Sequence, residues 1–420
     1  MPTPSGFWRR TSPQARAYLI GAVWMGASFT FPFTLLPLYL DHAGLSKAAV
    51  GTVVGGQAWG QFVAALPAAW ACSRYSARTV LSLSAVATAI CYLALPWIGP
   101  VGLDLFGLLV LANALTGFSW SFHMVAGAPF LYRHSEPGER ATLFSVSEAV
   151  RMGASVGGAL LAGWLATAAS EWIGDDARGH AIALSSAGFL TLSAIPAYLR
   201  IEDSVPRSSD RPPFLPTILA HRGLIARFAG PQLWISIGSG LTIPFMSLYF
   251  TEGFGFGSDD VGVLFASGQV LMSLGFLLTP WILSVAGYVK GVSGVQLLSL
   301  PFFLTLAFAT SPMVAVVAYL LRTALMNSAH PLMRTFLMES APAGLREVQN
   351  ALLMLLWGLG WIVGPWIGGL ILDATGNSYR VLMLTTSSMY VVGSVLSYFC
   401  LRGVEKRLNL PTSAAQPASA

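Results

Sequence analysis

Residues 141–164 read ATLFSVSEAVRMGASVGGALLAGW, and this stretch decides how the rest of the chain is interpreted. It is apolar, rich in glycine and long enough to cross a bilayer, which takes about 20 residues of α-helix. It nevertheless contains two charged residues, Glu148 and Arg151. A charge in hydrocarbon costs about 2.5–3.5 kcal/mol on insertion scales, so such residues are expected to face a bundle interior or a watery cavity. The stretch therefore predicts a membrane helix that borders a pathway.

The composition of the whole chain is that of a polytopic membrane protein. Of 420 residues, 55% are hydrophobic and only 10% are charged, against roughly 25% charged residues in a soluble domain. The net charge of +5 does not indicate nucleic-acid binding, because the basic residues lie in short turns and form no basic groove. The three cysteines, Cys72, Cys91 and Cys400, have no metal-ligand spacing, and we expect neither a metal nor another cofactor.

Twelve apolar runs are long enough to span a membrane. The first lacks a small-residue cleavage site at its end, so it is interpreted as a spanning helix and not as a signal peptide. The sequence thus predicts an all-α membrane protein made of two pseudo-symmetric six-helix bundles. The predicted spans are residues 17–40, 47–72, 79–98, 102–132, 142–168, 180–199, 228–251, 260–286, 292–310, 313–338, 347–372 and 380–401.

Basic residues gather in alternate loops between these runs. The loops on the other side hold only Lys47, Arg178 and Arg380. Loops that stay in the cytoplasm keep Lys and Arg, so both termini are predicted to be cytoplasmic. We expect the protein in a cell membrane, the inner membrane in a bacterium, as a monomer surrounded by the lipid bilayer.

The longest polar interval, residues 200–227, is rich in Pro, Ser and Arg and divides the chain. We expect an N-terminal bundle over residues 1–200, a cytoplasmic linker over 201–227, a C-terminal bundle over 228–402 and a disordered tail over 403–420. Residues 214–220 of the linker are interpreted as a short amphipathic helix on the membrane surface, with a regulatory site as the alternative.

The two halves repeat each other. Residues 30–33 (TFPF) in the first span correspond to residues 242–245 (TIPF) in the seventh. In each half an arginine after a Pro-containing turn, Arg140 or Arg346, opens a later glycine-rich helix. Parallel repeats related by an axis along the membrane normal build one recurrent transporter architecture.

With these landmarks, residues 15–402 resemble the major facilitator superfamily of twelve-helix secondary transporters. Residues 360–369 resemble that family's GxxxGPxxGG helix motif. The loop between the second and third spans departs from the family's usual GxxxDRxGRR, because Ser73 stands at the aspartate and only Arg74 and Arg78 keep basic positions. Asn113 stands where the family often has an arginine in the fourth span. The resemblance implies transport by one half rocking against the other.

Glycines at four-residue spacing let two helix backbones approach and slide. We interpret the glycine-rich parts of the fifth and eleventh spans as positions where the two halves move against each other. Close static packing needs the same glycines and is the alternative. The conformational residues predicted in this way are Gly153, Gly157, Gly360, Gly364 and Pro365.

Glu148 and Arg151 belong to a polar stripe on one helix face, since Thr142, Ser145 and Ser155 recur with them at intervals of three or four residues. Glu148 is the one carboxylate placed well inside a span, which makes it the candidate proton carrier. Arg151 opposes its protonation. The alternative is an i,i+3 ion pair in which Arg151 extends to the inner surface. Arg74 and Arg78 join this pair as coupling or gating candidates.

Arg322 is the residue we expect to contact substrate. It lies about ten residues into the tenth span with no acid within a helical turn, so it should face water, a substrate or a partner helix. Hydrogen bonding to helix-end carbonyls is the alternative. In the fold that the resemblance implies, the first, fourth, seventh and tenth spans line the cavity. The further substrate-binding candidates are His330, Asn113, Trp24, Thr30, Trp120, Ser239 and Thr242.

These wall residues favour one class of substrate. An apolar, aromatic wall with few charges suits amphipathic or aromatic solutes oriented by an arginine. No GxxxxGK[ST] nucleotide loop and no catalytic set occurs, so we expect neither an ATPase nor an enzyme. We expect proton-coupled export of a small organic solute. Uptake of a small organic anion or other metabolite, and lipid translocation on the same fold, are the alternatives.

Overall fold

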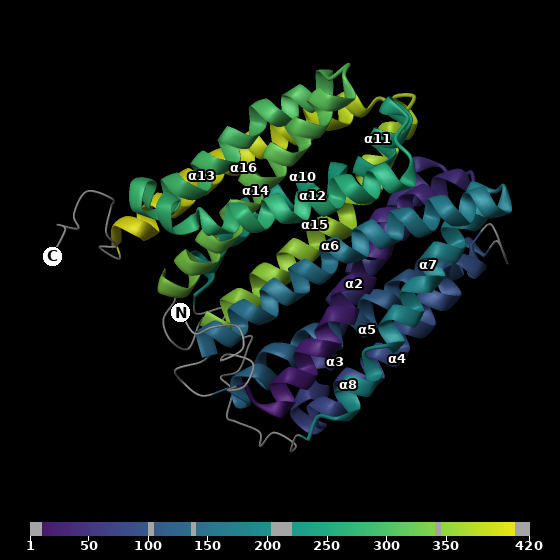
Figure 1. The fold of residues 1–420 in the computed structure, drawn as a ribbon. Helices are drawn as coiled ribbons and strands as arrows, with labels where there is room; N and C mark the ends of the chain where they lie inside the picture. Colours follow the sequence, from purple (N-terminus) through teal and green to yellow (C-terminus); the bar gives the residue numbers. More distant parts are fainter. Residues whose placement is uncertain (1–10, 100–104, 136–139, 203–220, 341–345, 408–420) are drawn as a thin grey trace. The chain divides into compact units, whose positions relative to one another are not determined.

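The computed structural model describes residues 11–99, 105–135, 140–202, 221–340 and 346–407, and within these ranges the chain forms helices and no strand. Figure 1 shows the helices as ribbons whose colour follows the sequence from the N-terminus to the C-terminus. Their bounds are α2 Pro13–His42, α3 Lys47–Arg74, α4 Ala77–Ile98, α5 Phe106–Arg133, α6 Arg140–Ile173, α7 Asp176–Leu192, α8 Ile195–Leu199, α10 Arg222–Thr242, η1 Ile243–Phe245, α11 Met246–Phe254, α12 Ser258–Leu277, α13 Thr279–Phe308, α14 Pro312–Ser340, α15 Arg346–Ala374 and α16 Tyr379–Arg407.

The prediction of an all-helical membrane fold is confirmed. Within the described residues, eleven helical segments are long and apolar enough to cross a membrane. The sixth span is built from α7 and α8, and the seventh from α10, η1 and α11. The helix outside the eleven is α3, in which four glycines, Gln57 and Gln61 interrupt the apolar residues. Orientation in the membrane stays a prediction.

α13 contains a sharp break at Gly287. This residue has φ 73°, in the left-handed region that glycine adopts without strain. A Cβ added at Gly291 would lie 3.2 Å from Cγ2 of Ile282, although a straight helix would separate two residues nine positions apart by about 13 Å. The chain therefore turns back at Gly287, and the predicted boundary between the eighth and ninth spans is confirmed.

The turn at Gly287 is completed by an acid from the last helix. Oε1 of Glu405 in α16 accepts hydrogen bonds from the backbone N–H groups of Tyr288 (2.9 Å) and Val289 (3.2 Å). These are among the donors that a starting helix leaves without an intrahelical partner. Glu405 thus caps the helical run that follows Gly287.

Contacts divide the chain into two units. The first comprises Met1–Ser209 and Ser247–Ala266, and the second comprises Asp210–Met246 and Ser267–Ala420. The sequence division into residues 1–200 and 228–402 stays a prediction. α10 begins at Arg222, within the expected linker, and α16 continues to Arg407, within the expected tail. The predicted segment 214–220 and residues 408–420 lie outside the described residues.

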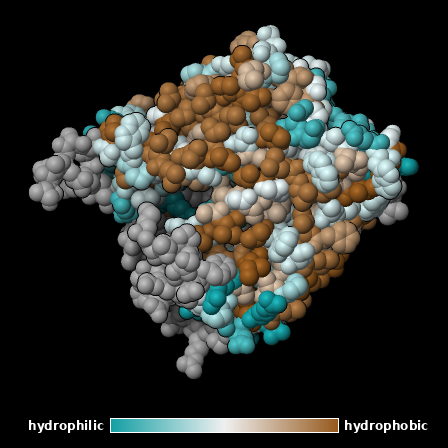
Figure 2. All heavy atoms as spheres, in the orientation of Figure 1, coloured by the Kyte–Doolittle hydropathy of each residue, from teal (hydrophilic) through white to brown (hydrophobic). Residues whose placement is uncertain are grey.

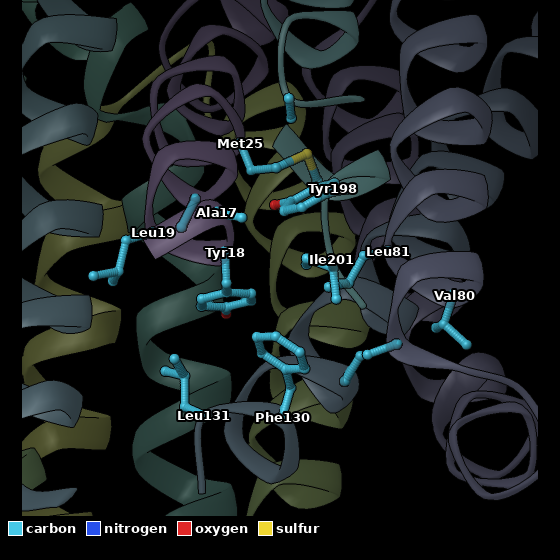
Figure 3. Packing of buried hydrophobic residues seen from close by; sticks show 14 of the residues in the cluster. Ala17, Tyr18, Leu19, Met25, Val80, Leu81, Phe130, Leu131, Tyr198 and Ile201 are labelled. Atoms are coloured by element: carbon cyan, nitrogen blue, oxygen red, sulfur yellow. The ribbon is translucent and has the colours of Figure 1, made fainter. Parts of the chain in front are cut away.

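Each unit has a core in which aromatic rings are prominent. In the first unit, Tyr18 of α2 packs against Phe130 of α5 and Tyr198 of α8, with ring centroids 5.6 Å and 6.5 Å apart (Figure 3). In the second unit, Phe336 of α14 packs against Phe228 and Tyr288, at 5.4 Å and 5.3 Å. These rings join helices that are distant in sequence.

Large apolar side chains also cover the outside of the helices. Leu66, Leu277, Trp281 and Phe399 are among those exposed, and Figure 2 shows hydrophobic residues spread over much of the visible face. A soluble monomer rarely exposes large contiguous apolar patches. Such a surface is expected of helices surrounded by lipid.

The sequence repeat is matched by a repeat in helix packing. In the first unit, a Cβ at Gly158 of α6 would collide with Ala27 of α2, and Ser155 donates to the backbone oxygen of Gly26 (3.3 Å). In the second unit, a Cβ at Gly364 of α15 would lie 2.6 Å from Cα of Gly240 in α10. The first and fifth spans therefore pack as the seventh and eleventh do.

The predicted conformational glycines differ in their surroundings. Within the described residues, a Cβ at Gly153 or Gly157 would meet no atom within 4 Å. They lie on the exposed side of α6, whereas Gly158 faces α2. Gly360 packs against Ser236 of α10, in the same unit.

Pro365 belongs to this same contact. Its Cδ would lie 3.2 Å from a Cβ added at Gly240 of α10. Packing within the second unit accounts for Gly360, Gly364 and Pro365. Rocking at the five predicted positions stays a prediction.

Alanine at two of these glycines separates close packing from open space. We expect Gly364→Ala to lower the thermal unfolding midpoint of the purified protein, because overpacking costs about 1–3 kcal/mol and the clashing neighbour is backbone. Gly157→Ala is the matched control and should leave the midpoint unchanged or slightly higher, since alanine favours helix. Equal midpoints for the two variants, measured by intrinsic fluorescence, would contradict this packing.

Candidate functional site

Arg322 of α14 is a buried cation inside the second unit, with only 4% of its surface exposed. Its Nη2 donates a hydrogen bond to the hydroxyl of Tyr390 in α16 (2.6 Å). The guanidinium also lies over the rings of Phe303 (5.0 Å) and Tyr390 (5.6 Å). Its Nε is buried and has no hydrogen-bond partner in the described part of the chain.

The hydroxyl of Tyr390 connects Arg322 to Ser239 of α10, 2.9 Å away. Arginine has only donors, so the tyrosine oxygen must accept from Arg322. The single tyrosine proton is then available for Ser239. Two predicted substrate-binding residues, Arg322 and Ser239, are thus brought together by a residue that the sequence reasoning missed. Tyr390 lies in an apolar run among many hydroxyl residues, and no signal there distinguishes it.

Thr242 and His330 lie near this cluster. Thr242 is hydrogen-bonded to Thr386 of α16 (2.6 Å), one helical turn from the Ser239 and Tyr390 pair. His330 is exposed and packs edge-on against Trp357 at 5.0 Å. Trp357 in turn packs against the apolar cluster that contains Tyr390. All four predicted residues of the second unit therefore belong to one neighbourhood.

The predicted substrate residues of the first unit are less closely grouped. Thr30 is buried and donates to its own helix at Ala27 (2.8 Å). Trp120 is buried and stacks on Phe29 with ring centroids 4.7 Å apart, whereas Trp24 is exposed. The first two are therefore engaged in packing in this arrangement.

Asn113 has a structural partner. Its Nδ2 donates to the backbone oxygen of Val53 (2.7 Å), which ties α5 to α3, while its Oδ1 has no partner among the described residues. A Cβ added at Gly117, one turn later, would collide with the backbone of Gln57. Asn113 thus lies where α5 packs closely against α3.

Glu148 and Arg151 form the i,i+3 ion pair. Nε of Arg151 donates to Oε2 of Glu148 (3.1 Å), and Nη2 donates to Oε1. Their side chains are 55% and 35% exposed, so the pair lies on the surface of α6. Ser155, on the same stripe, points instead to α2. Arg74 and Arg78 are exposed and form no ion pair within the described residues. The coupling roles of these four residues stay predictions.

Lys47 is a second buried cation, and sequence reasoning treated it only as an outer-loop residue. It is 5% exposed and binds two carboxylates, Asp41 at the end of α2 and Glu252 of α11. The sequence repeat could have indicated Asp41 and Glu252 as related residues, because each follows a Leu-Tyr dipeptide, at residues 38–39 and 248–249.

Three further polar contacts hold the segment that contains Glu252. Thr167 of α6 accepts from the backbone N–H of Asp259 and bonds to its carboxylate, both at 3.2 Å. Nε2 of His180 in α7 lies 2.7 Å from the hydroxyl of Ser258. Residues 247–266 are therefore fastened to α2, α3, α6 and α7 of the first unit by a network that includes Lys47.

A sequence model of the Major Facilitator Superfamily matches the chain over residues 18–353 and 232–419. The chain belongs to this superfamily. As a Major Facilitator Superfamily member it is a multi-pass membrane protein, and secondary transport is the function general to its family. No group of His, Cys, Asp or Glu able to hold a metal ion is found among the described residues.

Solved structures with the same fold include several Major Facilitator Superfamily transporters. A bacterial homolog of the human lysosomal transporter Spinster is 13% identical, with a TM-score of 0.77 over 93% of this chain and 97% of that one. The nucleoside transporter NupG is 15% identical (TM-score 0.74, 93% and 98%). A D-xylose-proton symporter is 14% identical (TM-score 0.69, 92% and 97%). No curated protein matches the chain in sequence.

Removing the Lys47 charge tests the network of the first unit. We expect Lys47→Met to destabilise the purified protein by about 1–3 kcal/mol, because Asp41 and Glu252 are only 24% and 29% exposed and would face each other without a cation. Adding Glu252→Gln to this variant should recover part of the loss. The measurement is the thermal unfolding midpoint.

Lys406→Met removes an exposed lysine and serves as the control. If it lowers the midpoint as much as Lys47→Met, the Lys47 contacts do not stabilise the first unit.

Proposed function

We propose that this protein is a secondary active transporter that exports a small amphipathic or aromatic organic solute in exchange for protons. The observation that carries the proposal is the buried Arg322, which lies against aromatic rings in a helix bundle and has no acid beside it in the described residues. A buried membrane arginine of this kind marks a substrate or ion pathway by default.

The surroundings of Arg322 favour an organic solute with an aromatic or apolar body. Phe303, Tyr390 and Trp357 supply flat apolar surface, and Met326 adds a flexible apolar side chain. Ser239 and Tyr390 supply a small number of hydroxyls. Ligand sites of this composition use apolar surface for affinity and a few polar groups for orientation.

Glu148 is the group we propose for proton coupling. It is exposed on a membrane helix and held by Arg151 through two hydrogen bonds. Protonation of the carboxylate would cancel its attraction to Arg151, so proton binding would release the arginine. If Glu148 were exposed first to one side of the membrane and then to the other, its binding and release of a proton would be coupled to solute movement.

We also propose that the protein lies in a cell membrane, that it moves the solute out of the cell, and that it is not an enzyme. The few interior charges and the apolar surroundings of Arg322 favour a solute that also dissolves in lipid, and such solutes enter cells without a carrier. Uptake of an organic anion uses the same residues in the opposite direction. The sign of the flux under an imposed gradient distinguishes the two.

Transport by purified protein in liposomes tests the proposal. Candidate solutes are first selected by thermal-shift screening against metabolites, antibiotics and lipids, because a ligand that binds only the native state raises its stability. We expect solute flux to respond to an imposed pH gradient. Glu148→Gln should abolish the response to the gradient while leaving downhill flux, because the amide cannot exchange protons.

Glu171→Gln changes an exposed carboxylate on the same helix and should behave as the unaltered protein. Gradient-driven flux that survives in Glu148→Gln would remove this residue from the coupling role. A fluorescent phospholipid in the same liposomes tests the lipid alternative. Its translocation without flux of any soluble candidate would replace the proposal.

A further inference from the structure

We infer that the edge of Arg322 that faces Tyr390 is a binding site for a carboxylate group of the transported solute. This inference rests on the proposed function and adds the charge class of the substrate. Two comparisons support it: the charge partners of the buried Lys47 and Arg322, and the hydrogen bonds made by Arg151 and by Arg322.

Two lysine or arginine residues are buried in the described part of the chain, Lys47 and Arg322. Lys47 is neutralised by two carboxylates, Asp41 and Glu252. Arg322 has no carboxylate within ion-pair distance among the described residues, and its hydrogen-bonded oxygen is the neutral hydroxyl of Tyr390. A buried charge is costly unless it is paired. Arg322 therefore lacks an anion that Lys47 has.

The hydrogen bonds of Arg151 show what fills such an edge. Nε and Nη2 of Arg151 hold the two oxygens of the Glu148 carboxylate. In Arg322 only one of the same two donors is hydrogen-bonded. Nη2 donates to Tyr390, and the buried Nε has no acceptor among the described residues. The guanidinium fork matches a carboxylate in two parallel hydrogen bonds. One carboxylate would satisfy both donors.

Tyr390 occupies the place that one carboxylate oxygen would take. Its hydroxyl is also bonded to Ser239, so it can release Arg322 and keep a partner. Phe303 contacts the guanidinium through its ring, which cannot take the place of a carboxylate oxygen in a hydrogen bond to Nε or Nη2. The donors of Arg322 therefore match a carboxylate group, and the apolar or aromatic body of the solute is the one given under the proposed function.

Binding of matched probes tests this site without knowledge of the natural solute. Purified protein is titrated with 2-naphthoate, 2-naphthamide and 2-naphthylmethylamine, which share an aromatic body and differ in charge. The readout is the ligand-induced rise in the thermal unfolding midpoint. We expect the carboxylate to stabilise the protein and the amide and the amine to have weaker effects.

Variants assign the preference to Arg322. Arg322→Gln should weaken carboxylate binding about tenfold or more, because charge-assisted hydrogen bonds are lost. Arg322→Lys should keep part of the affinity, because the charge remains while the fork is lost. Tyr390→Phe should strengthen carboxylate binding, because the competing hydroxyl is removed. Arg380→Gln removes an exposed arginine and should change nothing.

Three outcomes would overturn the inference: no stabilisation of the unaltered protein by the carboxylate, equal stabilisation by all three probes, or carboxylate binding unchanged in a folded Arg322→Gln. If Arg322→Gln does not fold, weaker or equal carboxylate binding in Tyr390→Phe overturns it instead. Carboxylate binding without flux of any solute in liposomes would defeat the transport proposal and leave this site standing. Flux of neutral solutes with no carboxylate preference would defeat the carboxylate site and leave the transport proposal standing.

Discussion

Close approach of helix backbones at small residues is the constraint on which each unit depends. Lipid around the helices is as apolar as their side chains, so hydrophobicity alone gives little reason for them to associate. Gly364 against Gly240, Gly158 against Ala27 and Gly117 against Gln57 bring main chains into contact at positions where a single methyl group would not fit. These contacts fix helices that carry or adjoin Arg322, Tyr390 and Asn113.

Within these packed helices, three cationic side chains differ in the groups that surround them. Lys47 is buried with two acids, and Arg151 is paired with Glu148 on the surface of α6. Arg322 is buried beside a phenol and an aromatic face. The first two arrangements are complete within the protein. The third is completed, under the proposed function, by the solute itself, which is why it is central to the proposed transport.

Much of the fold could be predicted because membrane spans are encoded locally. Apolar runs located the helices, and even the boundary at residues 286–292 fell at the turn of Gly287. The repeat of TFPF and TIPF predicted two related halves, which the packing of α2 on α6 and of α10 on α15 matches. Arg322 was recognisable because a charge deep in an apolar run is conspicuous.

The partners of these residues could not be predicted in the same way. Tyr390 is one hydroxyl among many in α16, and only its approach to Arg322 gives it significance. Gly153 and Gly157 have the same spacing as packed glycines, yet the rotation of α6 turns them away from α2 and presents Gly158. Spacing defines a helix face, but it does not say which face meets a neighbour.

The cap that Glu405 provides at Gly287 has a consequence for the order of synthesis. The turn between the eighth and ninth spans is made early relative to the last helix, yet two of its main-chain N–H groups receive their acceptor from a residue near the end of α16. Until α16 has left the ribosome and entered the membrane, that turn has no side-chain cap from Glu405. The C-terminal bundle can therefore acquire its complete hydrogen bonding only after translation has passed residue 405.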